Sequence, residues 1–459
     1  MKKNLRFNAL KQDERVKQAK ALLKEAYLEH QSKLNTIQEP NAALVDAYQT
    51  LLDSFGKKRG GALFYPYLSS GFGKGALVEL ADGSVKYDFI SGIGAHFTHS
   101  DPDLLDAAIN ASLQDSIMQG NLQQNLSSVK LVQKLTQLSK LDHAFLTTSG
   151  AMAVENGLKL AMQKHSPASR VLAFEGCFMG RSLAAASITD KDAYRSGLPI
   201  TLSVDYLPFY DSRNPKKSIE KTVDALKQFL KRFPGKYACM CFELIQGERG
   251  YFAGTTEFYR AIMDVLKEHD IAVFVDEIQS FGRLDTPFAF QHFGLEDYVD
   301  IVTVGKLSQV CATLYRKNYK PQPGLISQTF TSSTVAIESA LIILNKMQKE
   351  GYWGENGKII TLSNYFRKGL KRLAKQFPQR VSGPFGYGAM LAFTLDDGGK
   401  FRTVQFIKQL FHMGVLSFIA GAEPTRIRFL MPIGGVCKKD IDEVLSILEK
   451  AIIRFNPKV

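Results

Sequence analysis

Short apolar runs alternate with amphipathic stretches through the middle of the chain, from about residue 140 to 345. Residues 150–165 and 255–270 carry apolar side chains at helical spacing. Because strands that alternate with helices pair in parallel and are covered on both faces, the pattern predicts an α/β domain with a mainly parallel sheet. The apolar runs of strand length lie at 143–148, 170–176, 237–245, 271–277 and 299–306.

The two ends of the chain have a different pattern. Residues 75–94 are typical of a hairpin in which Asp82 and Gly83 form the turn. After Gly351, helical segments mix with short apolar strands. These features predict a smaller α+β domain built from both ends of the chain. The predicted parts are residues 1–100 with an N-terminal helix, the large domain 101–345, and residues 346–459.

The N-terminal segment carries much of the positive charge, which is +13 for the whole chain. Residues 1–35 hold nine Lys or Arg against four Asp or Glu, and apolar side chains recur at helical spacing over residues 16–27. A basic helix can be an arm for nucleic acid, but the amphipathic spacing favours a helix that docks on the protein through its apolar face. We therefore expect neither nucleic acid nor a membrane as a partner.

The cysteines and the termini favour a cytoplasmic location. The charged start of the chain is not followed by an apolar stretch, and no apolar run is long enough to cross a bilayer. Five cysteines, an odd number, suit a reducing compartment better than a disulfide framework. Cys239 and Cys241 face the same side of a predicted strand, where we interpret them as core thiols rather than metal ligands.

Two carboxylates end the apolar run that begins at Ile271, namely Asp276 and Glu277. A charge at the end of a buried strand is costly unless a cation meets it there. The strand-like run before Gly305 ends in Lys306. A lysine in an apolar cleft has a lowered pKa and can form a Schiff base. A simple ion pair between Lys306 and Asp276 is the alternative at this point.

Two further strand ends carry the remaining parts of a candidate site. Ser149, Gly150 and Ala151 open a helix after a strand, and a helix N-terminus with small residues suits a phosphate. Phe178 follows another strand, in a turn where its ring can lie over a planar ligand. A phosphate site, an aromatic plate, a carboxylate and a lysine together match pyridoxal 5′-phosphate (PLP). Asp276 would keep the pyridine nitrogen protonated, so that the ring withdraws electrons from the substrate.

The chain resembles the class III aminotransferases, of the ornithine and 4-aminobutyrate type, over roughly residues 60–450. This resemblance implies fold type I of PLP enzymes, with a seven-stranded, mainly parallel sheet between helices, plus a smaller domain. The motifs that carry it are "TSGAMAVENGLKLA", "VLAFEGCFMGRSLAAASIT", "FELIQGERGYFAG" and "FVDEIQSFGRLDTPFAFQHFGLEDYVDIVTVGK".

The resemblance implies roles for four more residues. Gln279 matches a glutamine near the phenolic oxygen of the cofactor, and Glu243 matches a glutamate beside the substrate. Thr329 matches a threonine that reaches the phosphate from the neighbouring subunit, which implies a homodimer. Arg428 resembles the arginine that binds the substrate carboxylate, for which a guanidinium is suited. Without a carboxylate in the site, we expect Glu243 to pair with Arg428.

The sequence departs from the family pattern around the predicted pocket. The turn that is usually Tyr-His-Gly is Phe178-Met179-Gly180, and Met152 stands where a glutamate is usual. Residues 331–334 read Thr-Ser-Ser-Thr instead of Gly-Gly-Asn-Pro. The stretch "VGKLSQVCATLY" resembles the lysine 6-aminotransferase branch. These changes affect the substrate more than the cofactor.

The sequence therefore predicts an enzyme that moves an amino group from an ω-amino acid such as lysine, ornithine or 4-aminobutyrate to 2-oxoglutarate, using PLP on Lys306. Two alternatives stay open. One is other PLP chemistry on the same fold, as in an aminomutase or a decarboxylase, because a fold does not fix a reaction. The other is a non-catalytic binding protein that has kept the fold, although such a protein has no need of a buried reactive lysine.

Overall fold

The computed structural model describes residues 5–115 and 118–455. Contacts between Cα atoms divide the chain into two compact units. The first, called unit 1, comprises residues 1–115, 361–384 and 391–459, and the second, unit 2, comprises residues 116–360 and 385–390. The domain boundaries at residues 100 and 345 remain predictions.

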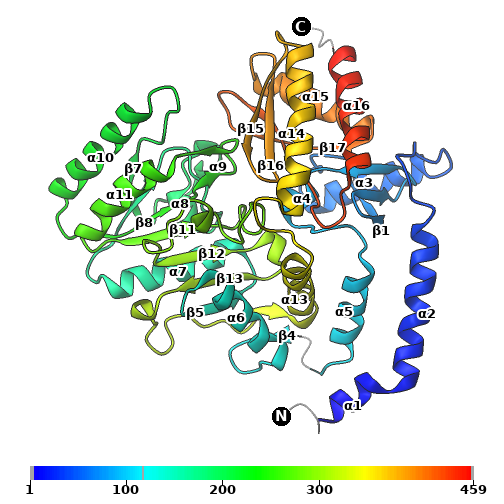
Figure 1. Cartoon of the computed structure of the whole chain (residues 1–459), viewed down its shortest axis with the longest axis horizontal. Helices are drawn as coiled ribbons and strands as arrows, with labels where there is room; N and C mark the ends of the chain where they lie inside the picture. The colour runs from blue at the N-terminus through cyan, green and yellow to red at the C-terminus, as the bar shows by residue number, and fades with distance from the viewer. Residues whose placement is uncertain (1–4, 116–117, 456–459) are drawn as a thin grey trace. The chain divides into compact units, whose positions relative to one another are not determined.

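Unit 2 is built on a seven-stranded sheet with the order β5-β13-β12-β11-β8-β6-β7 (Figure 1). Only β13 runs antiparallel to its neighbours, so the predicted mainly parallel sheet is confirmed. Two short pairs, β9–β10 and β4–β14, lie outside this sheet. The strands are β4 (Met118–Gln119), β5 (His143–Thr147), β6 (Arg170–Phe174), β7 (Ser203–Leu207), β8 (Tyr237–Phe242), β9 (Ile245–Gln246), β10 (Phe252–Ala253), β11 (Ala272–Asp276), β12 (Ile301–Val304), β13 (Cys311–Tyr315) and β14 (Ser332–Ser333).

Helices cover both faces of the unit 2 sheet, as the alternation of its apolar runs requires. In β8, Cys239 and Cys241 face the side on which Val154 of α7 packs, in one buried cluster with Phe274. Met240, between them, faces the other side, where Phe258 of α11 meets Phe174 of the neighbouring β6. The helices are α6 (Leu126–Ser139), α7 (Gly150–Lys164), α8 (Leu183–Ile188), α9 (Asp192–Arg195), α10 (Pro215–Arg232), α11 (Thr256–Glu268), α12 (Ala289–His292) and α13 (Thr334–Lys349), with 3₁₀ turns η1 (Lys306–Ser308) and η2 (Lys317–Tyr319).

Unit 1 contains two four-stranded sheets, with the orders β1-β2-β3-β17 and β15-β16-β19-β18. The predicted hairpin is confirmed: β2 and β3 pair antiparallel, and Gly83 takes a φ of 79° in the turn. The strands are β1 (Ser69–Lys74), β2 (Leu77–Leu80), β3 (Val85–Asp88), β15 (Val381–Tyr387), β16 (Met390–Leu395), β17 (Val415–Leu416), β18 (Phe418–Ala420) and β19 (Arg426–Leu430). The last three residues of β15 and the first of β16 belong to unit 2.

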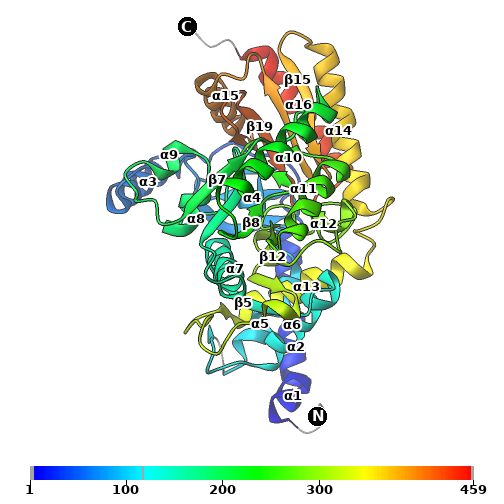
Figure 2. The same cartoon turned by 90° about the vertical axis from the view of Figure 1, so that its left-hand side faces the viewer.

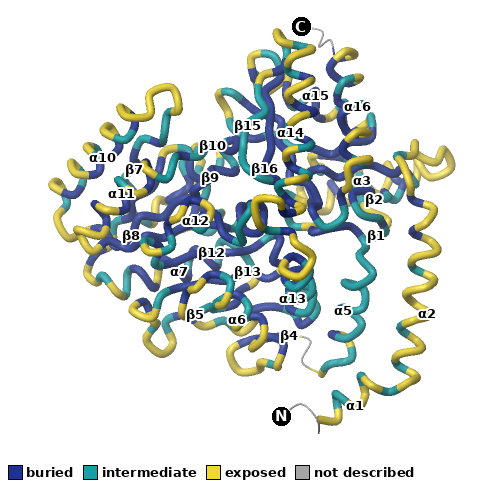
Figure 3. Tube along the Cα trace, viewed as in Figure 1, coloured by how far each residue is buried: buried dark blue, intermediate teal, exposed yellow. Residues whose placement is uncertain are grey.

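The helices of unit 1 include the predicted N-terminal helix, α2, whose apolar face is only partly covered by the rest of the unit. Leu22 and Leu23 are 66% and 53% exposed, and most of α2 is coloured as exposed in Figure 3. The helices are α1 (Arg6–Gln12), α2 (Glu14–Gln31), α3 (Val45–Arg59), α4 (Ser91–Gly94), α5 (Pro102–Ser112), α14 (Lys358–Gln376), α15 (Lys400–His412) and α16 (Lys438–Arg454), and α14 begins with three residues of unit 2.

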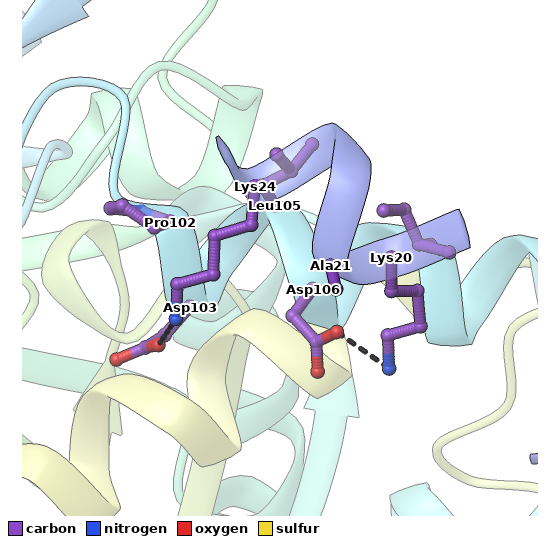
Figure 4. Close-up of a pocket in the computed structure, with 8 residues that line it drawn as sticks. Lys20, Ala21, Lys24, Pro102, Asp103, Leu105 and Asp106 are labelled. Carbon is purple, nitrogen blue, oxygen red and sulfur yellow. Dashed lines mark hydrogen bonds and ion pairs between the residues drawn. The ribbon is translucent and has the colours of Figure 1, made fainter. Parts of the chain in front are cut away.

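Polar contacts hold α2 against α5 (Figure 4). Lys20 pairs with Asp106 at 2.5 Å, and Lys24 pairs with Asp103 at 3.4 Å. A cavity of about 280 Å³ remains between the two helices. The expected docking helix therefore makes contacts through lysines as well as through Tyr27, whose ring lies edge-on to that of Phe72 with 5.4 Å between the ring centres. Among the described residues, no helix is long and apolar enough to span a membrane.

Candidate functional site

The carboxyl ends of five strands of unit 2 lie along one edge of its sheet, where α/β folds bind their ligands. Strands β6, β8, β11 and β12 run in the same direction, and β5 joins them through the antiparallel β13. All the predicted site residues except Thr329 and Arg428 follow, or lie at, one of these ends. They are Ser149, Gly150 and Ala151 after β5, Phe178 after β6, Glu243 after β8, Asp276 and Gln279 at and after β11, and Lys306 after β12.

Ser149 begins α7 as its N-cap residue. Its backbone is extended, with φ −146° and ψ 156°, and its side chain accepts a hydrogen bond from the backbone N–H of Met152 at 3.2 Å. Gly150 lies against Ile278, because a Cβ added to it would come within 3.2 Å of that side chain. The small residues thus bring the start of α7 close to the end of β11 and leave its first N–H groups available for an anion.

Asp276 is a buried carboxylate, 8% exposed. It accepts a hydrogen bond from the N–H of Ile278 at 2.8 Å. Burial raises the pKa of Asp276 from 3.8 to about 6, against the opposing influence of that hydrogen bond and of the positive charge of Lys306. The influence of Lys306 means that the two side chains lie within electrostatic range of each other. The raised pKa indicates that further positive charge would stabilise this carboxylate.

Lys306 has a left-handed backbone, with φ 52°. This conformation costs a non-glycine residue about 1 to 2 kcal/mol. It is held by the N–H of Gln309, which donates to the Lys306 carbonyl at 2.9 Å. Gly305 packs closely here, since a Cβ on it would lie 2.8 Å from the sulfur of Cys311. Strain of this kind persists where the surroundings fix a functional side chain.

Glu243 connects the turn of Phe178 to the segment after β8. Its carboxylate accepts hydrogen bonds from the N–H groups of Phe178 and Gly247, each at 2.9 Å. Burial raises the pKa of Glu243 from 4.5 to about 8, and the charge of Asp276 adds to this. The carboxamide of Gln279 lies next to Gly247, where an added Cβ would come within 2.5 Å of it. The predicted site residues at the strand ends of unit 2 are therefore neighbours.

Thr329 and Arg428 are placed differently. Thr329 is exposed, and the residue before it, Gln328, accepts a hydrogen bond from Thr147 at the end of β5, at 2.8 Å. Arg428 is buried in unit 1, 5.7 Å from the centre of the Phe418 ring. Its role toward a carboxylate and its pairing with Glu243 both remain predictions.

The hydrogen bonds that stabilise the Glu277 carboxylate were not predicted from the sequence. It is fully buried, and its carboxylate accepts hydrogen bonds from the Ser280 hydroxyl at 2.8 Å and from the N–H groups of Ala289 and Phe290 at 2.7 and 2.8 Å. Hydrogen-bond donors rather than a cation therefore meet this second carboxylate. The N–H groups lie twelve and thirteen positions away, in the first two residues of α12, so no pattern close to Glu277 in the sequence predicts them.

Arg181 is a second residue that sequence reasoning missed. Its guanidinium lies 3.8 Å from the centre of the Tyr194 ring and 6.0 Å from that of Phe178. The ammonium of Lys191 lies 4.4 Å from the same Tyr194 ring. Over residues 5–115 and 118–455, neither cation has a carboxylate within ion-pair distance. The sequence feature that could have identified Arg181 is its position three residues after Phe178, the predicted aromatic plate.

The residues present fit PLP. The start of α7 offers N–H groups to a phosphate, and Asp276 is a buried carboxylate that a pyridinium would stabilise. Lys306 lies within electrostatic range of Asp276 and can hold the aldehyde. Within the described ranges no cluster of three or more His, Cys, Asp or Glu could hold a metal.

A comparison with protein families decides the class of the chain. Residues 67–452 match the model of the family described as Aminotransferase class-III. The chain is a class III aminotransferase. Members of this family depend on PLP, so the predicted family, enzyme class, fold type and cofactor are confirmed. Helices α1 to α3 precede the matched residues.

Relatives that are named as aminotransferases match this chain over most of their own length. An acetylornithine aminotransferase from Archaeoglobus fulgidus is 28% identical over 82% of this chain and 93% of its own length. A probable 4-aminobutyrate aminotransferase from Bacillus subtilis is 29% identical over 83% of this chain and 92% of its own. The fold matches that of a lysine aminotransferase from M. tuberculosis, solved in the internal aldimine form, with a TM-score of 0.77 at 23% identity over 87% of this chain and 98% of that one.

Proposed function

We propose that this class III aminotransferase transfers the amino group of an ω-amino acid, such as lysine, ornithine or 4-aminobutyrate, to 2-oxoglutarate. The observation that carries the proposal is that Lys306 lies within electrostatic range of the buried Asp276, at the ends of the neighbouring strands β12 and β11. The names of the relatives support a donor with a terminal amine, since they act on acetylornithine, 4-aminobutyrate and lysine. The cytoplasmic location stays a prediction.

Each predicted site residue at the strand ends of unit 2 has a defined task in this proposal. When bound, PLP supplies an electron-withdrawing ring that stabilises negative charge on the substrate carbon. Asp276 keeps the ring nitrogen protonated, and the first N–H groups of α7 bind the phosphate. The amine of Lys306 acts as the general base that removes the proton from the substrate carbon bearing the amino group. Gln279 orients the opposite edge of the ring, and Phe178 covers its face.

Arg181 and Lys191 support an anionic substrate. Both cations are held against the ring of Tyr194, beside the Phe178 that we propose as the cofactor plate. A guanidinium binds a carboxylate through paired hydrogen bonds. We therefore propose that Arg181 contacts a carboxylate of the amino donor or of the keto acid.

We also propose that two copies of the chain assemble, so that Thr329 reaches the partner's site. Exposed apolar side chains surround Thr329: Met118 and Leu122 are 53% and 100% exposed, and Phe330 is 40% exposed. The two segments that carry them are joined by the Thr331 N–H, which donates to the Gln119 carbonyl at 2.8 Å. Exposed apolar groups gathered in this way are typical of an interface. Leu122→Glu should yield monomers in size-exclusion chromatography, whereas Leu198→Glu, at another exposed leucine, should not.

The deciding experiment is an absorption spectrum of the purified protein with PLP, before and after L-lysine, ornithine, acetylornithine and 4-aminobutyrate. Lys306→Ala is the control. We expect PLP to attach covalently to the wild type but not to the variant, and one donor to convert the cofactor to its amine form. Consumption of one keto acid per donor supports an aminotransferase. Turnover without a keto acid would replace the proposal with an aminomutase or decarboxylase, and no PLP attachment would replace it with a binding protein.

A further inference from the structure

A left-handed turn in unit 1 requires an explanation. The four residues of α4, Ser91 to Gly94, have φ values of 46°, 63°, 60° and 84°. Ser91 and Ile93 are not glycines, and each costs about 1 to 2 kcal/mol in this conformation. Such a conformation persists only where neighbouring groups hold it.

A buried carboxylate holds the start of this turn. Asp88, at the end of β3, accepts hydrogen bonds through Oδ1 from the N–H groups of Ile90 at 3.0 Å and Ser91 at 2.6 Å. Its other oxygen, Oδ2, lies 3.0 Å from Nε2 of His99. Asp88 and His99 are 2% and 8% exposed. Burial opposes ionisation of Asp88, but its contacts with His99 and with the two amides outweigh it and hold the pKa of Asp88 below its ordinary value.

The left-handed turn at Ser91 is hydrogen-bonded to β19, the strand that contains Arg428. The Ser91 hydroxyl donates to the Leu430 carbonyl at 2.6 Å. The Leu430 N–H donates to the Phe89 carbonyl at 2.7 Å. Leu430 follows Arg428 by two positions, so both side chains lie on the same face of the strand. A displacement of the turn therefore moves the strand at the point that carries the guanidinium.

We infer that Asp88 and His99 are positioning residues which, through the turn at Ser91, fix β19 and so set the place of Arg428 for the substrate carboxylate. His99 holds Asp88, Asp88 holds the turn, and Ser91 holds Leu430. The inference rests on the proposed function, because Arg428 must bind the carboxylate for its place to matter. In this reading the two residues act only through Arg428.

Steady-state kinetics of the PLP-loaded enzyme test the chain of contacts. His99→Ala and Ser91→Ala should each raise the KM for 2-oxoglutarate about tenfold, as a misplaced binding group does. Their kcat should change by less than about twofold, since the reacting atoms are not touched. His99→Gln, whose amide N–H can donate to Asp88, should have a KM close to that of the wild type. The exposed His412→Ala in the same unit is the matched control and should leave KM unchanged.

Arg428→Ala separates the two possible failures. If this variant leaves the KM for 2-oxoglutarate unchanged, Arg428 does not bind the carboxylate, and the inference falls with that part of the proposed function. If Arg428→Ala raises KM but Ser91→Ala and His99→Ala do not, the role of Arg428 stands and the positioning role is refuted. A fall in kcat equal to the loss in kcat/KM in the two alanine variants would also refute it, because it would indicate general damage to the fold.

Discussion

Asp276→Asn should make the cofactor-free protein more stable while weakening its function. The folded-state pKa of Asp276, about 6, lies above its ordinary value of 3.8. The folded protein therefore holds this proton more tightly than the unfolded chain, and ionised Asp276 destabilises the fold increasingly as the pH rises from about 4 to above 6. A difference of about 2 in pKa corresponds to about 3 kcal/mol.

The asparagine has nearly the same shape and can still accept the hydrogen bond from Ile278, but it carries no charge. We expect it to recover up to about 3 kcal/mol at pH 8 and about half of that at pH 5, where Asp276 of the wild type is largely protonated. In thermal unfolding of the cofactor-free protein, the melting temperature should rise by several degrees at pH 8 and by less at pH 5. The exposed Asp297→Asn is the control and should shift neither value.

The same substitution should weaken cofactor binding, because it removes a charge-assisted hydrogen bond worth about 1.5 to 3 kcal/mol. The dissociation constant of PLP, measured by spectral titration, should rise about 10- to 100-fold. The reasoning is refuted if Asp276→Asn lowers the melting temperature at pH 8 while PLP binds as tightly as in the wild type. Asp276 would then be a structural residue and not the partner of a pyridinium.

Three further variants test other parts of unit 2. Glu243→Gln should remove an inflection near pH 8 from the pH profile of kcat/KM for the amino donor, since the pKa of Glu243 is about 8; an unchanged profile would assign that inflection to another group. Gly157→Ala should lower the free energy of unfolding by about 1 to 3 kcal/mol, because its Cβ would lie 2.3 Å from the Phe274 ring, and adding Phe274→Leu should reduce the penalty of the alanine in a double-mutant cycle of thermal unfolding. Arg181→Ala should raise the KM for 2-oxoglutarate by about tenfold or more, as expected for loss of a bond to a charged group, while Arg213→Ala, at an exposed arginine, should not.

The parallel sheet and its ligand edge could be predicted because the relevant signals are local. The apolar runs at 271–277 and 299–306 each end in a charged residue, and they follow one another in the chain. The start of α7 was predictable for the same reason, since Ser149 and Gly150 stand directly before the helical pattern. Each of these residues lies next in the sequence to the strand or helix that positions it.

Other features depend on contacts between distant segments. The N–H donors to Glu277 come from the first two residues of α12, and the cations around Tyr194 come from two separate turns. The orientation of α2 was predicted only in part. Its apolar face is visible in the sequence, but the pairing of Lys20 with Asp106 involves a residue far along the chain. Such pairings follow from tertiary packing, which a single sequence does not encode locally.

The position of β5 has a consequence for how the polypeptide is made. β5 is one of the two edge strands of its sheet and, among the strands that the structure describes, pairs only with β13, where Thr147 lies opposite Cys311. More than 160 residues must leave the ribosome between these partners, so this pairing has a high contact order and forms late. Until then β5 presents a free edge of the kind that invites aggregation. The start of α7 follows β5 directly, so a chain stopped before β13 would lack both Lys306 in place and a fixed phosphate site. Capture of PLP would then report that β13 has been made and has paired with β5.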